Sequence, residues 1–368
     1  MWIGVFSVVF FIQISYFILL VMRLVTYRND GFFREGTNTL NAISIIIAAK
    51  NEAENLLKNL PLFLELNYPE FEVVVVLNDT NDRSQKILQE MESIYTNLVV
   101  CVLPIDYHGK KAALAFGVEK ASHNNLVFSD ADCRPQNDGW LMPFGAAFSN
   151  GVELVLGSGL FETESGLVNK LYRLESERIA MRYMLAAMIS APYMGVGRSM
   201  GYTKSLYEKV DGFIGHSEIA SGDDDLFIQS IPNGTKTMAV PEALTMSKAP
   251  DSLVSWFGQK QRHLQTGTRY KSVHLLLLGL LDLSDLIIVL GLPFSLLYMS
   301  PDAFIAILTT ALFVYILKAI ALWRFETIVG LKSRVWIYFF LEPILSLLNP
   351  LFSIASQFGQ PTEWTRKT

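Results

Sequence analysis

Residues that would cross-link a small domain or hold a zinc ion are scarce in this sequence. Only two cysteines, Cys101 and Cys133, occur in 368 residues. They form no C-x-x-C pair, and no cluster of cysteine and histidine has the spacing of a zinc site. The sequence therefore predicts neither a disulfide framework nor a zinc site, and it suits a reducing compartment.

An excess of positive charge is also missing. The chain has 30 Lys and Arg residues against 35 Asp and Glu residues, so no global basic field exists that would attract nucleic acid. Neither G-x-G-x-x-G nor G-x-x-x-x-G-K-[ST] follows the first predicted strand. Because these motifs cradle the phosphates of dinucleotides and nucleotides, their absence argues against a dinucleotide-dependent oxidoreductase and a P-loop NTPase.

Long apolar runs, by contrast, are abundant. Hydrophobic residues make up 51% of the chain, and no residue from Trp2 to Met22 is charged. About 21 helical residues can cross a hydrocarbon core roughly 30 Å thick. Arg23 and Arg28 follow this run and place its C-terminal end in the cytoplasm. A cleaved signal peptide is the alternative, but the basic n-region and the small-residue cleavage site are missing.

Three further apolar segments follow toward the C-terminus, near residues 275–299, 303–323 and 335–357. The loop between the last two is basic, which marks it as cytoplasmic; it contains Arg324, Lys332 and Arg334. We therefore predict a multi-pass protein of the cell (inner) membrane, with four spans and a cytoplasmic domain between the first and the second.

Ionisable residues interrupt the predicted C-terminal spans. Lys318 and Glu342 lie at similar depths in their segments, so we expect them to pair. Asp282 and Asp285 are three residues apart on one helical face. The alternative for these aspartates is that residues 264–285 form an amphipathic helix on the membrane interface and the span begins later.

Between residues 43 and 130, short β-branched runs alternate with helical patterns. This alternation predicts a parallel sheet with right-handed crossovers. The predicted strands are nearly all apolar, as expected when helices cover both faces: Ile43–Ala49, Val73–Leu77, Leu98–Leu103 and Leu126–Ser129. Sheets of this kind bind ligands at the carboxyl ends of their strands.

Polar residues follow three of these strands. Lys50-Asn51-Glu52 comes after the first, Asn78-Asp79-Thr80-Asn81-Asp82 after the second, and Asp130-Ala131-Asp132 after the fourth. Each group alone is explained by turns or helix N-caps, where Asp and Asn are common. Three such groups at one sheet edge predict a ligand site.

Six segments together resemble the motifs of one enzyme family in order and spacing. They are Ala48-Ala49-Lys50-Asn51-Glu52 for P-x-x-N-E, Asn78–Asp82 for D-D-x-S-x-D, Gly109-Lys110-Lys111-Ala112-Ala113-Leu114 for a glycine-lysine segment, Asp130-Ala131-Asp132 for D-x-D, Gly222-Asp223-Asp224-Asp225-Leu226 for G-D-D, and Gln259-Lys260-Gln261-Arg262-His263 for Q-x-x-R-W. Alanine replaces the first proline, the second motif is one residue shorter and starts with Asn, and histidine replaces the last tryptophan. With these departures, residues 42–265 resemble glycosyltransferase family 2.

The resemblance implies an α/β protein of the GT-A fold: a Rossmann-like, mostly parallel sheet, here with transmembrane helices at both ends. It also implies an inverting, metal-dependent hexosyltransferase that uses a nucleotide sugar, with a UDP-sugar as the first candidate. The acceptor would be a lipid or a lipid-linked glycan. The expected division is a transmembrane helix at 1–23, a linker at 24–41, the catalytic domain at 42–250, an interfacial segment at 251–272, about three transmembrane helices at 273–358 and a tail at 359–368.

Site residues follow from the same motifs. Asp132 would hold Mg²⁺ or Mn²⁺, which acts as a Lewis acid on the leaving diphosphate. Asp223 would be the general base that takes the proton of the acceptor hydroxyl. The residues expected to bind the donor are Ala49, Asn51, Glu52, Asp79, Lys110, Asp130, Gln259, Arg262 and His263.

Two of these site predictions have open alternatives. Crowding in the run Asp223-Asp224-Asp225 is expected to raise the pKa values of its carboxyl groups, whereas capping of the following helix explains at least one of them. Lys110 could instead be a solvated lysine at a helix N-terminus. Near the last motif, Trp256 and Phe257 are expected to anchor their helix at the membrane surface.

Other functions compete with single sugar transfer. A processive polysaccharide synthase would use a similar Q-x-x-R-W-like motif, and the membrane aspartates could line its channel. A membrane protein that senses nucleotides without catalysis would need the same α/β domain. A transporter is disfavoured because four spans without evident repeats do not match that class.

Overall fold

The computed structural model describes residues 2–27, 40–219, 221–267 and 269–356. Most of the predicted linker and the whole predicted tail lie outside the described residues. The chain divides into two compact units. We call one the helical unit (Met1–Tyr27, Glu164–Met181 and Pro250–Gln360) and the other the sheet unit (Arg28–Thr163, Arg182–Ala249 and Pro361–Thr368).

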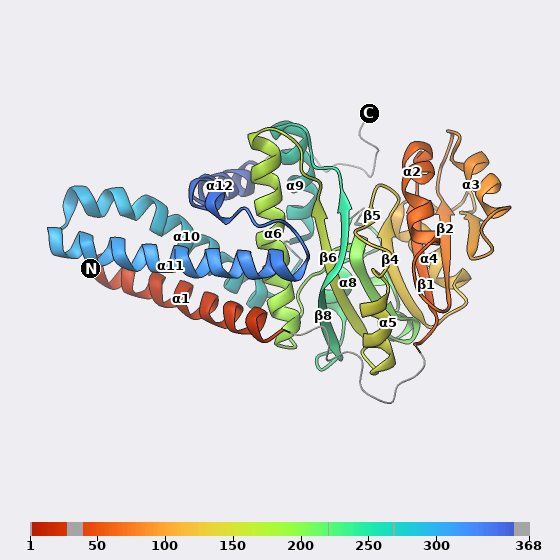
Figure 1. The fold of residues 1–368 in the computed structure, drawn as a ribbon, viewed down its shortest axis with the longest axis horizontal. Helices are drawn as coiled ribbons and strands as arrows, with labels where there is room; N and C mark the ends of the chain where they lie inside the picture. The colour runs from red at the N-terminus through yellow and green to blue at the C-terminus, as the bar shows by residue number, and fades with distance from the viewer. Residues whose placement is uncertain (1, 28–39, 220, 268, 357–368) are drawn as a thin grey trace. The chain divides into compact units, whose positions relative to one another are not determined.

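An eight-stranded sheet organises the sheet unit, in the order β3-β2-β1-β4-β7-β6-β8-β5 (Figure 1). The strands are β1 Ile43–Ala49, β2 Phe71–Leu77, β3 Leu98–Val102, β4 Asn125–Asp130, β5 Arg134–Pro135, β6 Leu154–Phe161, β7 Met200–Thr203 and β8 Thr237–Ser247. The first four are parallel and confirm the four predicted strands, with ends that differ by at most two residues. The other half is mixed, because β7 runs antiparallel to both β4 and β6.

The helices of the sheet unit are α2 Ala53–Leu64, α3 Ser84–Glu92, α4 Lys110–Lys120, α5 Met142–Ser149, α7 Lys204–Lys209 and α8 Asp225–Ser230, with short 3₁₀ turns η2 Gly197–Ser199 and η3 Ile214–His216. Helix α4 packs on β1 and β2. Gly117 makes this packing close, since a Cβ atom there would lie 2.6 Å from Cγ2 of Ile46. The close contact holds α4 against these strands. The helix begins after β3, and its first turn carries two lysines.

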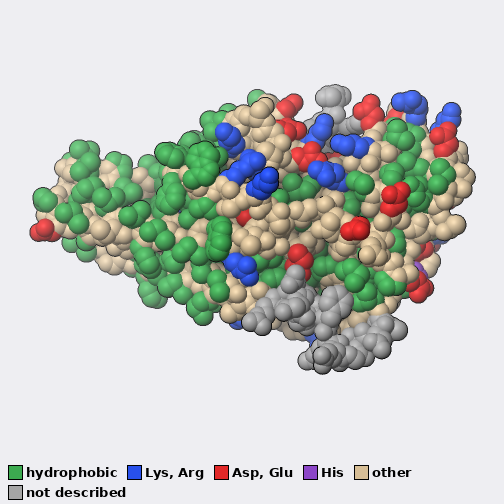
Figure 2. Space-filling model, in the orientation of Figure 1, with side chains coloured by type: hydrophobic (Ala, Val, Ile, Leu, Met, Phe, Trp, Pro, Cys, Tyr) green, Lys and Arg blue, Asp and Glu red, His purple; other side chains and the backbone are tan. Residues whose placement is uncertain are grey.

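Among the described residues of the helical unit, four helices are long and apolar enough to cross a membrane: α1 Trp2–Thr26, α10 Ser272–Tyr298, α11 Pro301–Ile328 and α12 Val335–Ser356. Helix α1 packs along α11 and α10, and Phe6, Val9 and Phe10 pack in one cluster with Ile288, Ile307, Ala311 and Val314. On the face shown in Figure 2, the side chains over α1, α10 and α11 are mostly hydrophobic. This pattern suits helices in contact with lipid chains.

The helix boundaries decide between the two interpretations of Asp282 and Asp285. Helix α9 (Leu253–Gly267) ends before α10 begins at Ser272, and both aspartates lie within α10. A single amphipathic helix over residues 264–285 is therefore wrong. The break has a local cause in the sequence, because Gly267 is a poor helix former and the residues from Thr268 to Lys271 are mostly polar.

Four buried charges meet inside the helical unit. Nζ of Lys318 lies 2.8 Å from Oε1 of Glu342, which confirms the predicted pair. Lys318 also contacts Asp285. Arg178, on helix α6 (Leu167–Met188), lies 2.9 Å from Asp285 and 3.2 Å from Glu342. The four side chains thus form a closed ring of alternating charge, which we call the ionic ring. Its charges balance, as burial in an apolar surrounding requires.

Candidate active site

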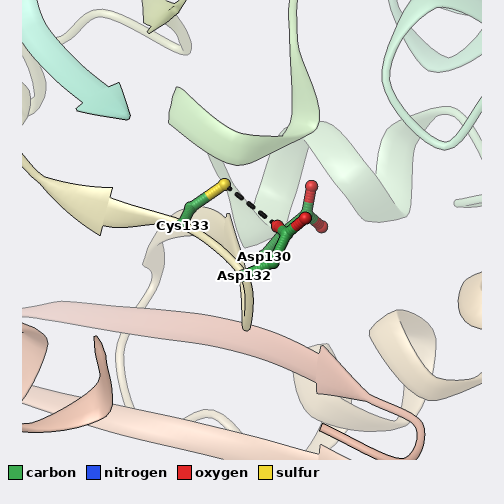
Figure 3. Close-up of side chains that lie close together, drawn as sticks. All are labelled: Asp130, Asp132 and Cys133. Carbon is green, nitrogen blue, oxygen red and sulfur yellow. Dashed lines mark hydrogen bonds between the residues drawn. The ribbon is translucent and has the colours of Figure 1, made fainter. Parts of the chain in front are cut away.

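Two carboxylates and a thiol meet at the carboxyl end of β4. Asp130 is the last residue of this strand, and the ligand atoms of Asp130, Asp132 and Cys133 lie within 4.8 Å of one another (Figure 3). Sγ of Cys133 donates a hydrogen bond to Oδ1 of Asp132 over 3.3 Å. Burial raises the pKa of this thiol well above its usual value, so it stays protonated. The two carboxylates are the hard oxygen donors that Mg²⁺ and Mn²⁺ prefer, and they fit such an ion.

Lys110 joins this carboxylate pair to a distant segment of the chain. Its Nζ lies 2.9 Å from Oδ1 of Asp130 and 3.0 Å from Oδ2 of Asp223. Gly109 precedes it with φ of 94°, a left-handed conformation that glycine adopts without strain, and so turns the chain into α4. Only 18% of the Lys110 side chain is exposed, so the alternative of a solvated lysine is wrong.

The three consecutive aspartates have different hydrogen-bond and ion-pair partners. Asp224 accepts the N–H of Gly197 through Oδ2, over 2.9 Å, and the N–H of Asp225 through Oδ1, over 2.8 Å. Asp225 accepts the N–H of Leu226 over 2.8 Å. These two carboxylates therefore bind backbone at the start of α8, as the capping alternative expects. Asp223 is the aspartate that contacts Lys110.

Lys110 also sets the protonation of Asp223. Burial by itself would raise the pKa of this carboxyl group, but the charge of Lys110 and its hydrogen bond outweigh burial and lower the pKa below its usual value. Burial, followed by the charges of Asp223 and Asp225, raises the pKa of Asp224 to about 7. The expectation that crowding raises the pKa values is therefore wrong for Asp223, because the charge and the hydrogen bond of Lys110, which is distant in sequence, lower its pKa.

This arrangement predicts a specific pH dependence. Asp223 is ionised throughout the neutral range, so we expect the rate of transfer at saturating donor to fall only in acid solution. Lys110→Met removes the lowering charge and should move the acid limb of the rate profile to higher pH. A profile of kcat against pH for both proteins measures this shift. An acid limb that does not move in Lys110→Met would contradict the proposed control of Asp223.

A hydrogen bond and an ion pair connect the segments that follow β1 and β2. Asn51 and Asp79 have positive φ angles of 54° and 45°, which Asn and Asp adopt more readily than most residues. Oδ1 of Asn51 accepts the N–H of Asn81 over 2.8 Å, and Lys50 lies 3.3 Å from Asp79. The side chain of Asp79 is 40% exposed and accessible to a ligand. The polar residues after β1 and β2 thus have structural contacts in addition to their predicted role.

The remaining predicted donor contacts differ in position. The side chain of Ala49 is buried, and its carbonyl accepts the N–H of Asn78 over 2.9 Å. Glu52 precedes α2 and donates its N–H to Oγ of Ser84 over 3.1 Å. Donor binding by these residues stays a prediction.

The Q-x-x-R-W-like motif belongs to the helical unit, where Gln259, Arg262 and His263 lie on α9. Oε1 of Gln259 accepts the hydroxyl of Tyr172 over 2.7 Å. Burial lowers the pKa of the Arg262 guanidinium below its usual value. Their part in donor binding also stays a prediction.

Trp256 does not anchor α9 at a membrane surface. It is buried, with 1% of its surface exposed, and its Nε1–H donates to Oε2 of Glu175 over 2.9 Å. The expectation of an interfacial tryptophan is therefore wrong: a buried acceptor on α6 satisfies the indole N–H that would otherwise favour the interface.

Sequence reasoning missed Arg198, which lies next to the carboxylate pair. Its guanidinium lies over the ring of Phe161, 4.2 Å from the centroid, and donates to the carbonyl of Gly159 over 2.7 Å. The site desolvates Asp132 and, together with the charge of Asp130, raises its pKa, while Arg198 opposes the rise. An isolated arginine between small residues has no motif that could have identified it.

Comparisons with known proteins agree with this architecture. Residues 44–210 match the family model described as Glycosyl transferase family 2. Glycosyltransferase AglE of Haloferax volcanii is 35% identical over 133 residues, which are 35% of this chain and 43% of the relative. The probable glycosyltransferase YdaM of Bacillus subtilis is 24% identical over 253 residues, which are 64% of this chain and 57% of the relative. The chain spans about half the length of these curated relatives.

One solved structure shares the fold over nearly the whole chain. It is the mannosyltransferase PcManGT from Pyrobaculum calidifontis in complex with GDP-Man and Mn²⁺, with a TM-score of 0.55, 16% identity, and coverage of 97% of this chain and 96% of that chain. The chain contains a family 2 glycosyltransferase domain with the GT-A fold, which confirms the family and the fold that its motifs predict.

Proposed function

We propose that this protein is a membrane glycosyltransferase that transfers a sugar, with inversion, from a nucleotide-sugar donor to a lipid or lipid-linked glycan. The observation that carries the proposal is the double contact of Lys110 with Asp130 and Asp223. This contact brings the predicted metal-binding segment and the predicted base to one place. A UDP-sugar is the first candidate donor, and GDP-sugars belong in the same assay.

In the proposed reaction, Asp223 accepts the proton of the acceptor hydroxyl as that hydroxyl attacks the anomeric carbon. Lys110 keeps Asp223 ionised and holds it beside Asp130. Asp132, with Asp130 beside it, would hold Mg²⁺ or Mn²⁺, which supplies Lewis-acid stabilisation of the leaving diphosphate when bound. Asp79, at the exposed end of β2, would receive the ribose or base of the donor.

The four apolar helices support a membrane lipid as the acceptor or its carrier. We propose the orientation that the basic residues predict, with the sheet unit in the cytoplasm. A channel for a growing polymer gains no support from Asp285, because this side chain is paired with Arg178 and Lys318 in the ionic ring. We therefore propose single transfer as the first candidate and processive synthesis as the alternative.

Turnover distinguishes the proposal from a nucleotide sensor. The full chain, purified in detergent or lipid nanodiscs, is expected to release UDP or GDP from one radiolabelled nucleotide sugar and to move the label into a membrane-lipid extract. Chelation of divalent cations should stop both. Binding of nucleotide sugar without release of nucleotide, across the donor panel and with lipid extract present, would identify a sensor instead.

Metal dependence gives a more specific prediction. Asp132→Ala removes an exposed carboxylate whose contact with the buried thiol of Cys133 is a weak hydrogen bond, so the fold should persist while Mn²⁺-dependent donor binding is lost. Calorimetric titration of the protein with the nucleotide sugar, with and without Mn²⁺, measures this loss. Asp138→Ala is a control, because it removes a carboxylate of the same unit that lies outside the cluster. Unchanged donor affinity and metal response in Asp132→Ala would exclude its proposed role.

A further inference from the structure

Lys110 and Lys111, in the first turn of α4, bind two residues of one later segment of the chain. Lys110 contacts Asp223, as described above. Nζ of Lys111 lies 2.7 Å from Nδ1 of His216 and donates to the carbonyl oxygen of His216 over another 2.7 Å. The segment from His216 to Asp223 is therefore tied to the same helical turn at both ends.

The contact between Lys111 and His216 is buried. Each residue has 7% of its surface exposed. Taking a lysine out of water is costly unless hydrogen bonds compensate, and both bonds from Lys111 go to the same residue. A side chain that only filled this space could be a methionine, which has a similar shape and no charge. It would not need the two hydrogen bonds that Lys111 makes.

The same contact fixes the tautomer of His216. A lysine ammonium group only donates hydrogen bonds, so Nδ1 must accept and the ring proton lies on Nε2. Burial, followed by the charge of Lys111, lowers the pKa of His216 to about 4, so the ring is neutral near pH 7. The imidazole therefore acts as a hydrogen-bond acceptor of fixed orientation.

An aromatic cluster also packs near His216. Its ring lies 6.0 Å from that of Phe213, which packs on Tyr207 and Phe227. Phe227 belongs to α8, which begins two residues after Asp223. The residues before and after the tied segment are thus packed together, and the bonds of the two lysines connect the segment between them to α4.

We propose that Lys111 and His216 are positioning residues, which hold the 216–223 segment so that Asp223 stays beside Lys110 and aims at the acceptor hydroxyl. The inference rests on the proposed function, because it assigns this pair to the proposed base. Neither residue touches the reacting atoms. Their effect on rate comes through the placement of Asp223, for which an error of about 1 Å can cost roughly 10²-fold.

Two substitutions of His216 separate its two nitrogen atoms. His216→Asn places an amide oxygen near the position of Nδ1 and can still accept from Lys111, whereas His216→Gln places its amide near Nε2. We expect His216→Asn to keep kcat within a few-fold of wild type, and His216→Gln to lower it roughly 10²-fold with the donor KM little changed. Lys111→Met should behave like His216→Gln.

Other results would overturn the inference. Activity in His216→Gln and loss in His216→Asn would mean that Nε2, which has no partner among the described residues, contacts a ligand. Equal activity of the two variants, whether both normal or both inactive, would contradict a role for Nδ1. Thermal unfolding midpoints show whether each variant is folded.

A measurement on the wild-type protein keeps the inference falsifiable if the variants do not fold. The ¹⁵N resonances of the His216 ring should show a proton on Nε2 and none on Nδ1 between about pH 5.5 and pH 8. The opposite tautomer, or titration within this range, would refute the contact. Transfer by the wild type separates the two proposals: its absence refutes the proposed function, whereas normal transfer in all three variants refutes only the positioning role.

Discussion

Asp223→Asn is expected to lower the rate of sugar transfer by roughly 10²–10⁴-fold, the usual scale for general acid–base catalysis. Asparagine keeps the size of the side chain and can accept the hydrogen bond from Lys110, but it cannot take up a proton at neutral pH. Donor affinity should therefore barely change. The measurements are single-turnover transfer rates at saturating donor and donor dissociation constants.

The neighbouring aspartates supply matched controls. Asp224 accepts a backbone N–H through each of its oxygens, so Asp224→Asn loses one acceptor and should be destabilised by about 1 kcal/mol while the rate stays close to normal. Asp225 uses Oδ1 to accept the N–H of Leu226, a bond that asparagine also forms. A near-normal rate for Asp223→Asn would remove this residue from the mechanism, and a large loss in Asp224→Asn would move the base by one position.

Lys318→Met should strongly destabilise the helical unit, with a loss of about 3–5 kcal/mol. The substitution leaves Asp285 and Glu342 buried together with only Arg178 to neutralise them. The free energy of unfolding in mixed micelles, measured against increasing denaturing detergent, gives the size of the loss. Lys332→Met, in the loop after α11, is the control with a small expected effect.

The closed ring also determines which second substitution restores stability. Lys318→Met combined with Glu342→Gln removes one charge of each sign and leaves Arg178 paired with Asp285, so its loss should be smaller than the sum of the single losses. Charge reversal should fail, because Lys318→Glu would place a carboxylate beside Asp285, and Glu342→Lys would place an ammonium group beside Arg178. Additive losses in the neutral pair would show that the ring does not act as one unit.

Much of the fold was predictable because it depends on local patterns. The β-branched apolar runs at β1 to β4 are typical of buried parallel strands, and polar residues begin where those strands end. Asn51 and Asp79 also serve the turns at these ends through their positive φ angles. The antiparallel half was not predictable, since the pairing of β7 with β4 and β6 depends on segments that are distant in sequence and have no local signal.

The candidate site also has features that the sequence predicts and features that depend on the tertiary structure. The sequence alone determined the family, the carboxylates at the strand ends and the pairing of Lys318 with Glu342, because motif order, strand ends and helical depth are properties of the chain itself. Only the tertiary structure decided which aspartate of the triplet contacts Lys110, that its pKa is lowered, that Lys111 binds His216 and that Arg178 closes the ionic ring. The physical reason is that the energy of a buried charge depends on the groups placed around it, and the fold brings those groups from elements far apart in sequence.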